Sequence, residues 1–131
     1  MRLRAYEVQV ETAYGLVIRV VNHLSAGKAK ACVVFDLDGA ESPSSLFRKI
    51  RARSLGEPQT DAALERVQAY RNRPDLTAGR EVLCGRDKRR GWIAGASSGA
   101  GAHFRVVLED GSSVSAHPCD LSPSGGAEGP G

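Results

Sequence analysis

The sequence predicts an α+β fold in which strands and helices are segregated along the chain. Residues 4–10 alternate apolar and polar side chains, which is typical of a half-buried strand, and the β-branched run of residues 16–21 is predicted to return beside it as a hairpin. Residues 57–73 carry apolar side chains at helical spacing. From residue 79 onward, short apolar runs alternate with glycine turns, which predicts a second, strand-rich region.

A chain of 131 residues forms one ordinary domain or two very small ones. The patterns divide it into a small α+β unit at residues 1–56 and a bridging helix with its linker at residues 57–78. A strand-rich segment follows at residues 79–121. The last segment, residues 122–131, consists mainly of Ser, Gly and Pro with almost no apolar content, so we expect a disordered tail.

Residues 25–37 decide how the first unit is built. Ser25 is a preferred N-cap residue, because its hydroxyl can accept a hydrogen bond from a first-turn amide. Val34 and Phe35 favour a strand by propensity. A helical stripe opposes this preference, formed by Ala26, Ala29, Cys32, Val33 and Leu37. We favour a helix over about residues 25–37, then a turn, then a strand at residues 50–55.

The stretch from Val33 to Gly39 ends in Asp36-Leu37-Asp38-Gly39 and resembles the first motif of haloacid-dehalogenase-type phosphatases. The resemblance implies that Asp36 is the nucleophile and Asp38 the general acid and base, with Mg²⁺ between them. That family carries its motif on the first strand of a doubly wound sheet, whereas a hairpin comes first here and Ala40 stands where the family has Thr. We favour a helix end and a turn, and keep a minimal Mg-dependent phosphatase, which requires a strand at residues 29–37, as a less favoured alternative.

The strand-rich segment resembles the small SH3-like barrels of the KOW and Tudor type. The matching residues are Gly79-x-x-Val82, then Arg90-Gly91-Trp92-Ile93-Ala94-Gly95, then Phe104-x-Val106-x-Leu108-Glu109-Asp110-Gly111, and finally Pro118-x-Asp120-Leu121. The resemblance implies a module that binds nucleic acid, peptides or methylated side chains. Trp92 and Phe104 are too few aromatic residues for the cage that a methyl-lysine reader needs.

Basic residues supply the candidate binding site. The chain carries a net charge of +3 with a pI near 9.0, which permits contact with nucleic acid or an acidic protein surface without demanding either. A basic loop next to an aromatic residue is predicted between the first two strands of the barrel, and a second positive strip on the last strand of the first unit. The candidate nucleic-acid-binding residues are Arg86, Lys88, Arg89, Arg90 and Trp92 in the loop region, and Lys49, Arg51 and Arg53 on the strand.

Metal and membrane sites are not predicted. A metal site would have to gather Cys84, His103, His117 and Cys119, and this set lacks the Cys-x-x-Cys spacing of zinc sites, so we expect neither metal nor cofactor.

No apolar run approaches the roughly 18 residues that span a bilayer. The polar N-terminal stretch argues against a secretory signal, and three widely spaced cysteines argue against a disulfide framework. We therefore expect a cytoplasmic location.

The sequence thus predicts a non-enzymatic binding or adaptor protein. Nucleic acid is the first expected partner and another protein the second. In its general character the chain also resembles small proteins of prophages and plasmids, which favours an interaction module of a mobile element as the protein-binding alternative.

Overall fold

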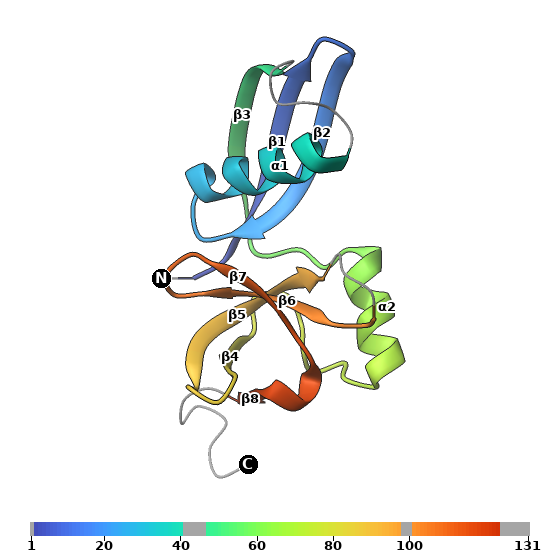
Figure 1. Cartoon of the computed structure of the whole chain (residues 1–131), viewed down its shortest axis with the longest axis vertical. Helices are drawn as coiled ribbons and strands as arrows, with labels where there is room; N and C mark the ends of the chain where they lie inside the picture. The colour runs from blue at the N-terminus through green and yellow to red at the C-terminus, as the bar shows by residue number, and fades with distance from the viewer. Residues whose placement is uncertain (1, 41–46, 98–100, 124–131) are drawn as a thin grey trace. The chain divides into compact units, whose positions relative to one another are not determined.

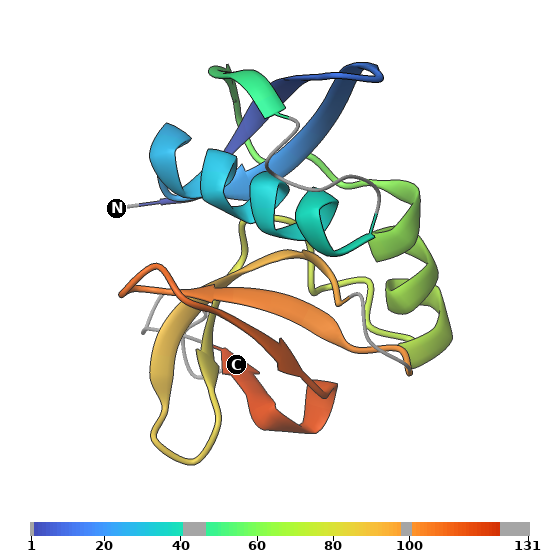
Figure 2. The same ribbon diagram turned by 45° about the horizontal axis from the view of Figure 1, so that its top comes forward.

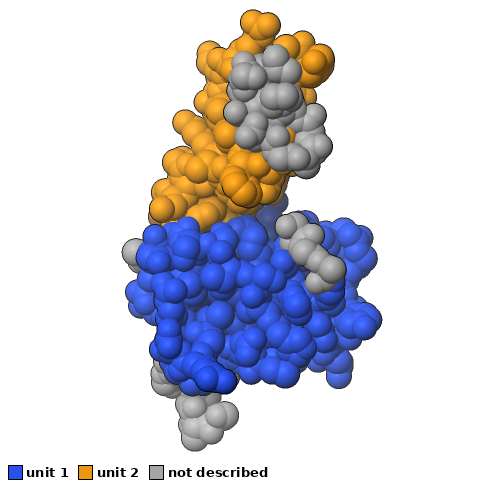
Figure 3. All heavy atoms as spheres, in the orientation of Figure 1, with its two compact units in different colours: residues 1–2, 59–131 blue, residues 3–58 orange. Residues whose placement is uncertain are grey.

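The computed structural model describes residues 2–40, 47–97 and 101–123, and within these ranges the chain is α+β, with two antiparallel sheets and two α-helices (Figure 1). The chain divides into two compact units, residues 3–58 and residues 59–131 together with residues 1–2 (Figure 3). Each unit contains one sheet and one α-helix with its own core, so we describe each separately.

The first unit is a three-stranded sheet with one helix. The predicted hairpin is confirmed, because the first two strands pair antiparallel across a tight turn closed by the pair Thr12 and Gly15. The strand order is β2-β1-β3, so the first strand lies in the centre. The elements are β1 (Arg4–Thr12), β2 (Gly15–His23), α1 (Ala26–Ala40) and β3 (Phe47–Gly56).

Helix α1 lies across one face of this sheet (Figures 1 and 2). Its buried side chains recur every fourth residue, which places them on one helix face, and they meet alternate side chains of β1. The buried cluster comprises Ala29, Val33 and Leu37 of α1 with Tyr6, Val8 and Val10 of β1. The opposite face of the sheet is therefore the face that α1 leaves open.

The predicted helix at residues 25–37 is confirmed at its start and is longer at its end. The Ser25 hydroxyl accepts a hydrogen bond from the Lys28 amide at 3.2 Å, as expected of an N-cap. The helix then continues to Ala40, through the residues predicted to form an Asp-Gly turn. The rest of the predicted turn, residues 41–45, lies outside the described residues.

The two outer strands of the first sheet differ in regularity. Strand β2 pairs with β1 from Thr12↔Gly15 to Arg4↔His23 without a register shift. Strand β3 pairs with the other side of β1 with two register shifts, which leave Arg48 and Leu55 as extra residues of β-bulges. Thus β2 is a regular edge strand, whereas β3 is bulged near both of its ends.

The second unit holds a five-stranded sheet of order β7-β6-β5-β4-β8. The first and last strands of this unit lie side by side, since Cys84 of β4 pairs with Leu121 of β8. The two outermost strands do not pair with each other among the described residues, so the sheet is not closed into a barrel. The elements are α2 (Ala62–Arg71), β4 (Glu81–Cys84), β5 (Arg89–Ala96), β6 (Phe104–Leu108), β7 (Ser113–Ala116), the 3₁₀ helix η2 (Pro118–Asp120) and β8 (Leu121–Pro123).

Helix α2 packs onto this second sheet. Its buried Leu64 and Val67 join a core that the strands complete with Val82, Ile93, Phe104, Val106, Leu108, Ala116 and Leu121. The helix is also shorter than the predicted span of residues 57–73, because Asp61 is its N-cap and accepts the Leu64 amide at 2.8 Å. Asn72 ends it in the left-handed conformation, with φ of 55°.

Two residues of the predicted disordered tail lie in a strand. Ser122 and Pro123 belong to β8, because they pair with Leu83 and Val82 of β4. The remainder of the predicted tail, residues 124–131, lies outside the described residues.

We predict that Gly91 is required for packing and that Gly95, on the same strand, is not. A Cβ atom at Gly91 would lie 2.8 Å from both Val106 Cγ1 and the Val107 carbonyl oxygen, whereas nothing lies within 4 Å of a Cβ at Gly95. Gly91→Ala should lower the free energy of unfolding by about 1–3 kcal/mol. Gly95→Ala should leave it unchanged or raise it by up to about 1 kcal/mol. Urea unfolding followed by the fluorescence of the single tryptophan measures both, and equal losses would contradict the packing described.

Candidate functional site

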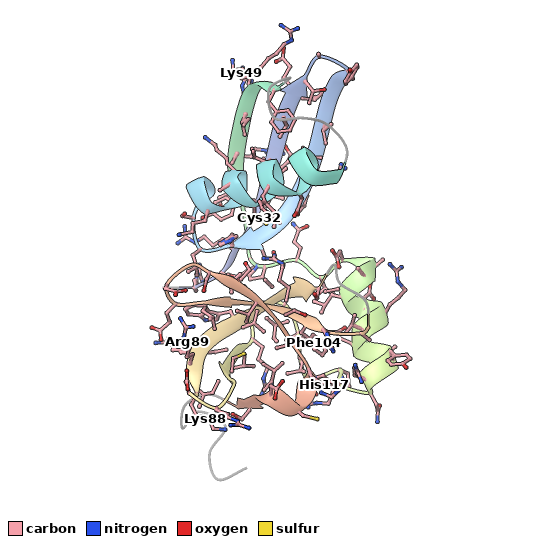
Figure 4. All side chains as sticks on the ribbon, in the orientation of Figure 1. Cys32, Lys49, Lys88, Arg89, Phe104 and His117 are labelled. Carbon is pink, nitrogen blue, oxygen red and sulfur yellow. The ribbon has the colours of Figure 1, made fainter. Side chains whose placement is uncertain are left out.

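The predicted site residues form two groups in two different units. One group lies at the β4–β5 turn and on β5 in the second unit, and comprises Arg86, Lys88, Arg89, Arg90 and Trp92. The other lies on β3 in the first unit, and comprises Lys49, Arg51 and Arg53. Figure 4 labels a basic residue from each group, Lys49 on β3 and Lys88 at the turn.

The predicted basic loop is shorter than expected. Only Arg86 and Lys88 lie in the turn, where both are exposed and where Lys88 adopts a left-handed φ of 55°. Arg89 and Arg90 belong to β5, because they pair with Cys84 and Leu83 of β4. The prediction that these two arginines lie in the loop between the two strands is therefore wrong, since both are strand residues.

Arg89 is paired with a carboxylate from the β6–β7 turn. Its guanidinium lies 2.9 Å from Asp110 Oδ2, and both side chains are about half exposed. The pKa of Asp110 falls to about 2, mainly because the Ser112 hydroxyl and amide donate to the carboxylate, with Arg89 adding to the effect. An exposed pair of this kind contributes little to stability. The pair matters for binding instead, because the Asp110 carboxylate offsets the positive charge that Arg89 would present to a ligand.

Arg90 is surrounded by acidic and aromatic groups. Its guanidinium lies 2.6 Å from Glu81 Oε1 and 3.8 Å from Glu109 Oε2, and its Cζ is 5.5 Å from the centre of the Trp92 ring. Trp92 is only 3% exposed, but it does not belong to the core cluster of the second unit, which contains the neighbouring Ile93. A nucleic-acid base can stack only on an exposed aromatic ring, and the buried ring of Trp92 offers little surface for that role.

The strip on β3 is arranged as the strand period predicts. Lys49, Arg51 and Arg53 alternate on the open face of the sheet and are exposed. Their neighbours on β1 are Glu11, Gln9 and Glu7. Arg53 is paired with Glu7 at 3.0 Å, which lowers the pKa of that carboxyl group and raises the pKa of the guanidinium. Within the described part of the chain, Lys49 and Arg51 have no ion-pair partner.

The residues weighed for catalysis lie on helix α1, and those weighed for metal binding lie in the second unit. Residues 29–37 are helical, which contradicts the phosphatase alternative, because that alternative required a strand ahead of Asp36. The His103 and His117 rings do meet edge to face, 5.7 Å between centres, but His117 Nδ1 accepts the Cys119 amide. No group of three or more potential metal ligands occurs among the residues that the structure describes. Burial is the main cause of the raised pKa of the Cys84 thiol.

A hollow of about 360 Å³ opens beside the β4–β5 turn. Its charged lining residues are Arg86, Arg89, Asp87 and Asp120, and its apolar ones include Leu108 and Val114. Two basic and two acidic side chains leave this hollow without a strong preference for an anionic ligand.

Strand β2 carries a feature that the sequence argument missed. Leu16, Ile18 and Val20 point to the open face of the sheet and are 58%, 48% and 50% exposed. Their neighbours on β1 are polar, so the apolar stripe lies along the outer strand. The sequence did contain a signal for this stripe, because residues 16–21 are apolar on both faces of the predicted strand, except at Arg19. A half-buried strand would alternate.

The four sheet edges are protected to different degrees. Edge strands expose unpaired backbone groups, and proteins commonly protect them by shortness, bulges or charged side chains. Strands β7 and β8 have four and three residues. Strand β3 has two bulges and four basic side chains. Strand β2 has nine residues, no bulge and one permanently charged side chain, and no described residue pairs with its outer side.

Comparisons of the chain with protein-family models, with curated proteins and with solved structures gave no match. Neither described helix is long and apolar enough to cross a membrane. The three cysteines, all of which lie in the described ranges, are present as thiols.

Proposed function

We propose that this protein is a non-enzymatic binding or adaptor protein whose partner is another polypeptide, bound at the outer edge of β2. The observation that carries the proposal is the apolar stripe of Leu16, Ile18 and Val20 on an edge strand without bulges. Neighbouring apolar side chains that stay exposed in a folded protein mark interaction surfaces. An open edge adds a row of backbone donors and acceptors that an extended segment can satisfy.

A strand added at this edge gains two kinds of contact. Its backbone completes the ladder of β2, and its alternate side chains lie beside the apolar stripe at the strand spacing of about 4.8 Å. Lys49 and Arg51, two strands away on the same face, add a polar rim that favours acidic residues in the partner. Apolar contacts near the edge with charges at the periphery are the usual composition of a protein interface.

We also propose that the second unit is a small, partly open SH3-like barrel, in a protein that works in a reducing, cytoplasmic setting. The pairing of its first and last strands and the core residues Phe104, Val106 and Leu108 on β6 support the barrel assignment. The three thiols support the reducing setting. Its barrel would be a second binding module, for which the charge-balanced hollow beside Arg86 favours a peptide over a polyanion.

Nucleic acid is the second candidate partner. The supporting observation is that Lys49 and Arg51 are exposed on one strand face without an ion-pair partner in the described ranges, with Arg86 and Lys88 as further exposed cations. We rank it second because the charges of Arg89 and Arg90 are offset by carboxylates. The basic side chains and bulges of β3 also serve as edge protection, which is a sufficient reason for them.

The polypeptide proposal predicts a position-specific cross-link. A photo-reactive benzoylphenylalanine placed at residue 18 should form adducts with polypeptide in extracts of the source cells, and nuclease treatment should leave these adducts intact. The same group at residue 35 is the control, since Phe35 is 80% exposed on α1 of the same unit. Adducts from position 18 that nuclease removes, or equal labelling from both positions, would count against a polypeptide partner at β2.

The nucleic-acid candidate predicts a salt effect that depends on β3. If Lys49 and Arg51 contact phosphates, replacing both by Ala should reduce the slope of log K against log salt by about 2. Binding to a labelled DNA or RNA oligonucleotide over a salt series measures this slope. Lys28→Ala with Lys30→Ala is the matched control, because it removes the same charge from α1. Unchanged slopes in both double variants, or no binding by the wild type, exclude this candidate.

A further inference from the structure

We infer that the strand added to β2 is β2 of a second copy of the chain, so that the protein forms a two-fold dimer with a continuous six-stranded sheet. This inference rests on the proposed function, and it identifies the polypeptide partner as a second copy of the same chain. A two-fold interface brings the same surface of two copies together, so that surface must be complementary to itself. Strand β2 meets this requirement in its length, in its apolar pattern and in the place of its charge.

The accessible part of β2 is symmetric about Ile18. The tight turn precedes Gly15, and Asn22 and His23 at the other end are buried. The stretch that remains runs from Gly15 to Val21, and Ile18 is its midpoint. An antiparallel pair of two such strands, centred on Ile18, therefore uses the accessible edge of both copies in full.

The same register matches the side chains on the open face. Ile18 lies opposite Ile18 of the second copy, and Leu16 lies opposite Val20 of the second copy on each side of the axis. Two exposed apolar stripes thus become one set of cross-strand apolar pairs. Because the side-chain period of a strand is two, a shift of one residue moves these pairs apart.

The position of Arg19 selects this register over one of its two neighbours, the register centred on Arg19. Centred on Ile18, the pair places Arg19 opposite Val17 of the second copy. Centred on Arg19, it would place two guanidinium groups directly opposite each other, which is destabilising. Charge therefore favours the register centred on Ile18 over the register centred on Arg19.

Charge also disfavours the other two-fold arrangement, in which two open faces stack. Since β1 is the central strand, stacking that covers the whole face brings Glu7 and Glu11 close to the same residues of the second copy, and Arg53 offsets only the charge of Glu7 beside it. In the edge-to-edge dimer the two β1 strands are three strand spacings apart, about 14 Å. This exceeds the Debye length of about 8 Å at physiological salt, so the acidic columns are screened from each other.

Sedimentation of the full-length chain over a concentration series, with charge variants at the axis, tests the inference. The wild type should pass from monomer to dimer as the concentration rises. Ile18→Lys and Ile18→Glu should each weaken self-association by about tenfold or more, because each places like charges opposite each other in place of an apolar pair. An equimolar mixture of the two variants should restore the dimer, because residue 18 faces itself only in this register.

Phe35→Lys is the control for the loss of an exposed apolar side chain elsewhere in the unit, and it should leave the association unchanged. Circular dichroism shows whether each variant is folded, and the mixture reports only on variants that are. A wild type that remains monomeric throughout, or a Lys and Glu mixture that stays monomeric while the wild type dimerises, overturns the inference. The cross-link from position 18 separates the two proposals. If it joins the chain only to other polypeptides, the proposed function stands and the dimer is rejected. If it gives no adduct at all, both proposals are rejected.

Discussion

The backbone of an edge strand presents amides and carbonyls that its own sheet cannot pair, and the two sheets of this protein manage that constraint unequally. The five-stranded sheet ends in strands of four and three residues. The three-stranded sheet has a bulged, basic edge at β3 and a regular, apolar edge at β2. An unprotected edge exposes a protein to aggregation unless it has a partner. The contrast between β2 and the other three edges is therefore the basis of the proposed function.

Much of the fold was predictable because its signals are local. The alternation of Tyr6, Val8 and Val10 predicted a strand with one buried face, and Ser25 predicted the start of α1. The errors arose at the ends of the elements. Helix α1 continues through Asp38 and Gly39, and α2 begins at the cap Asp61 rather than near Pro58. Pairing of Ser122 with β4 likewise depends on a strand that lies far away in the sequence.

The binding residues were less predictable, because charge alone does not reveal pairing. Arg89 and Arg90 were predicted to lie in a basic loop. Their carboxylate partners include Asp110 and Glu109, which follow about twenty residues later in the β6–β7 turn. Trp92 was predicted as a candidate binding residue, and it is buried outside the core cluster. The open edge of β2 was invisible for a related reason. The sequence predicted the hairpin but contained no local signal that β3 would pair with β1 and leave β2 outermost.

Amide hydrogen exchange along β2 tests the central claim, that its outer edge is open and accepts a strand. In dilute wild-type protein, the amides of Leu16 to Val21 that point away from β1 should exchange fast, and they should become protected as the protein concentration or the concentration of a bound partner rises. The amides of β3 should not respond. Outward amides of β2 that are protected even at high dilution, or that stay unprotected when a partner is bound, would contradict the account.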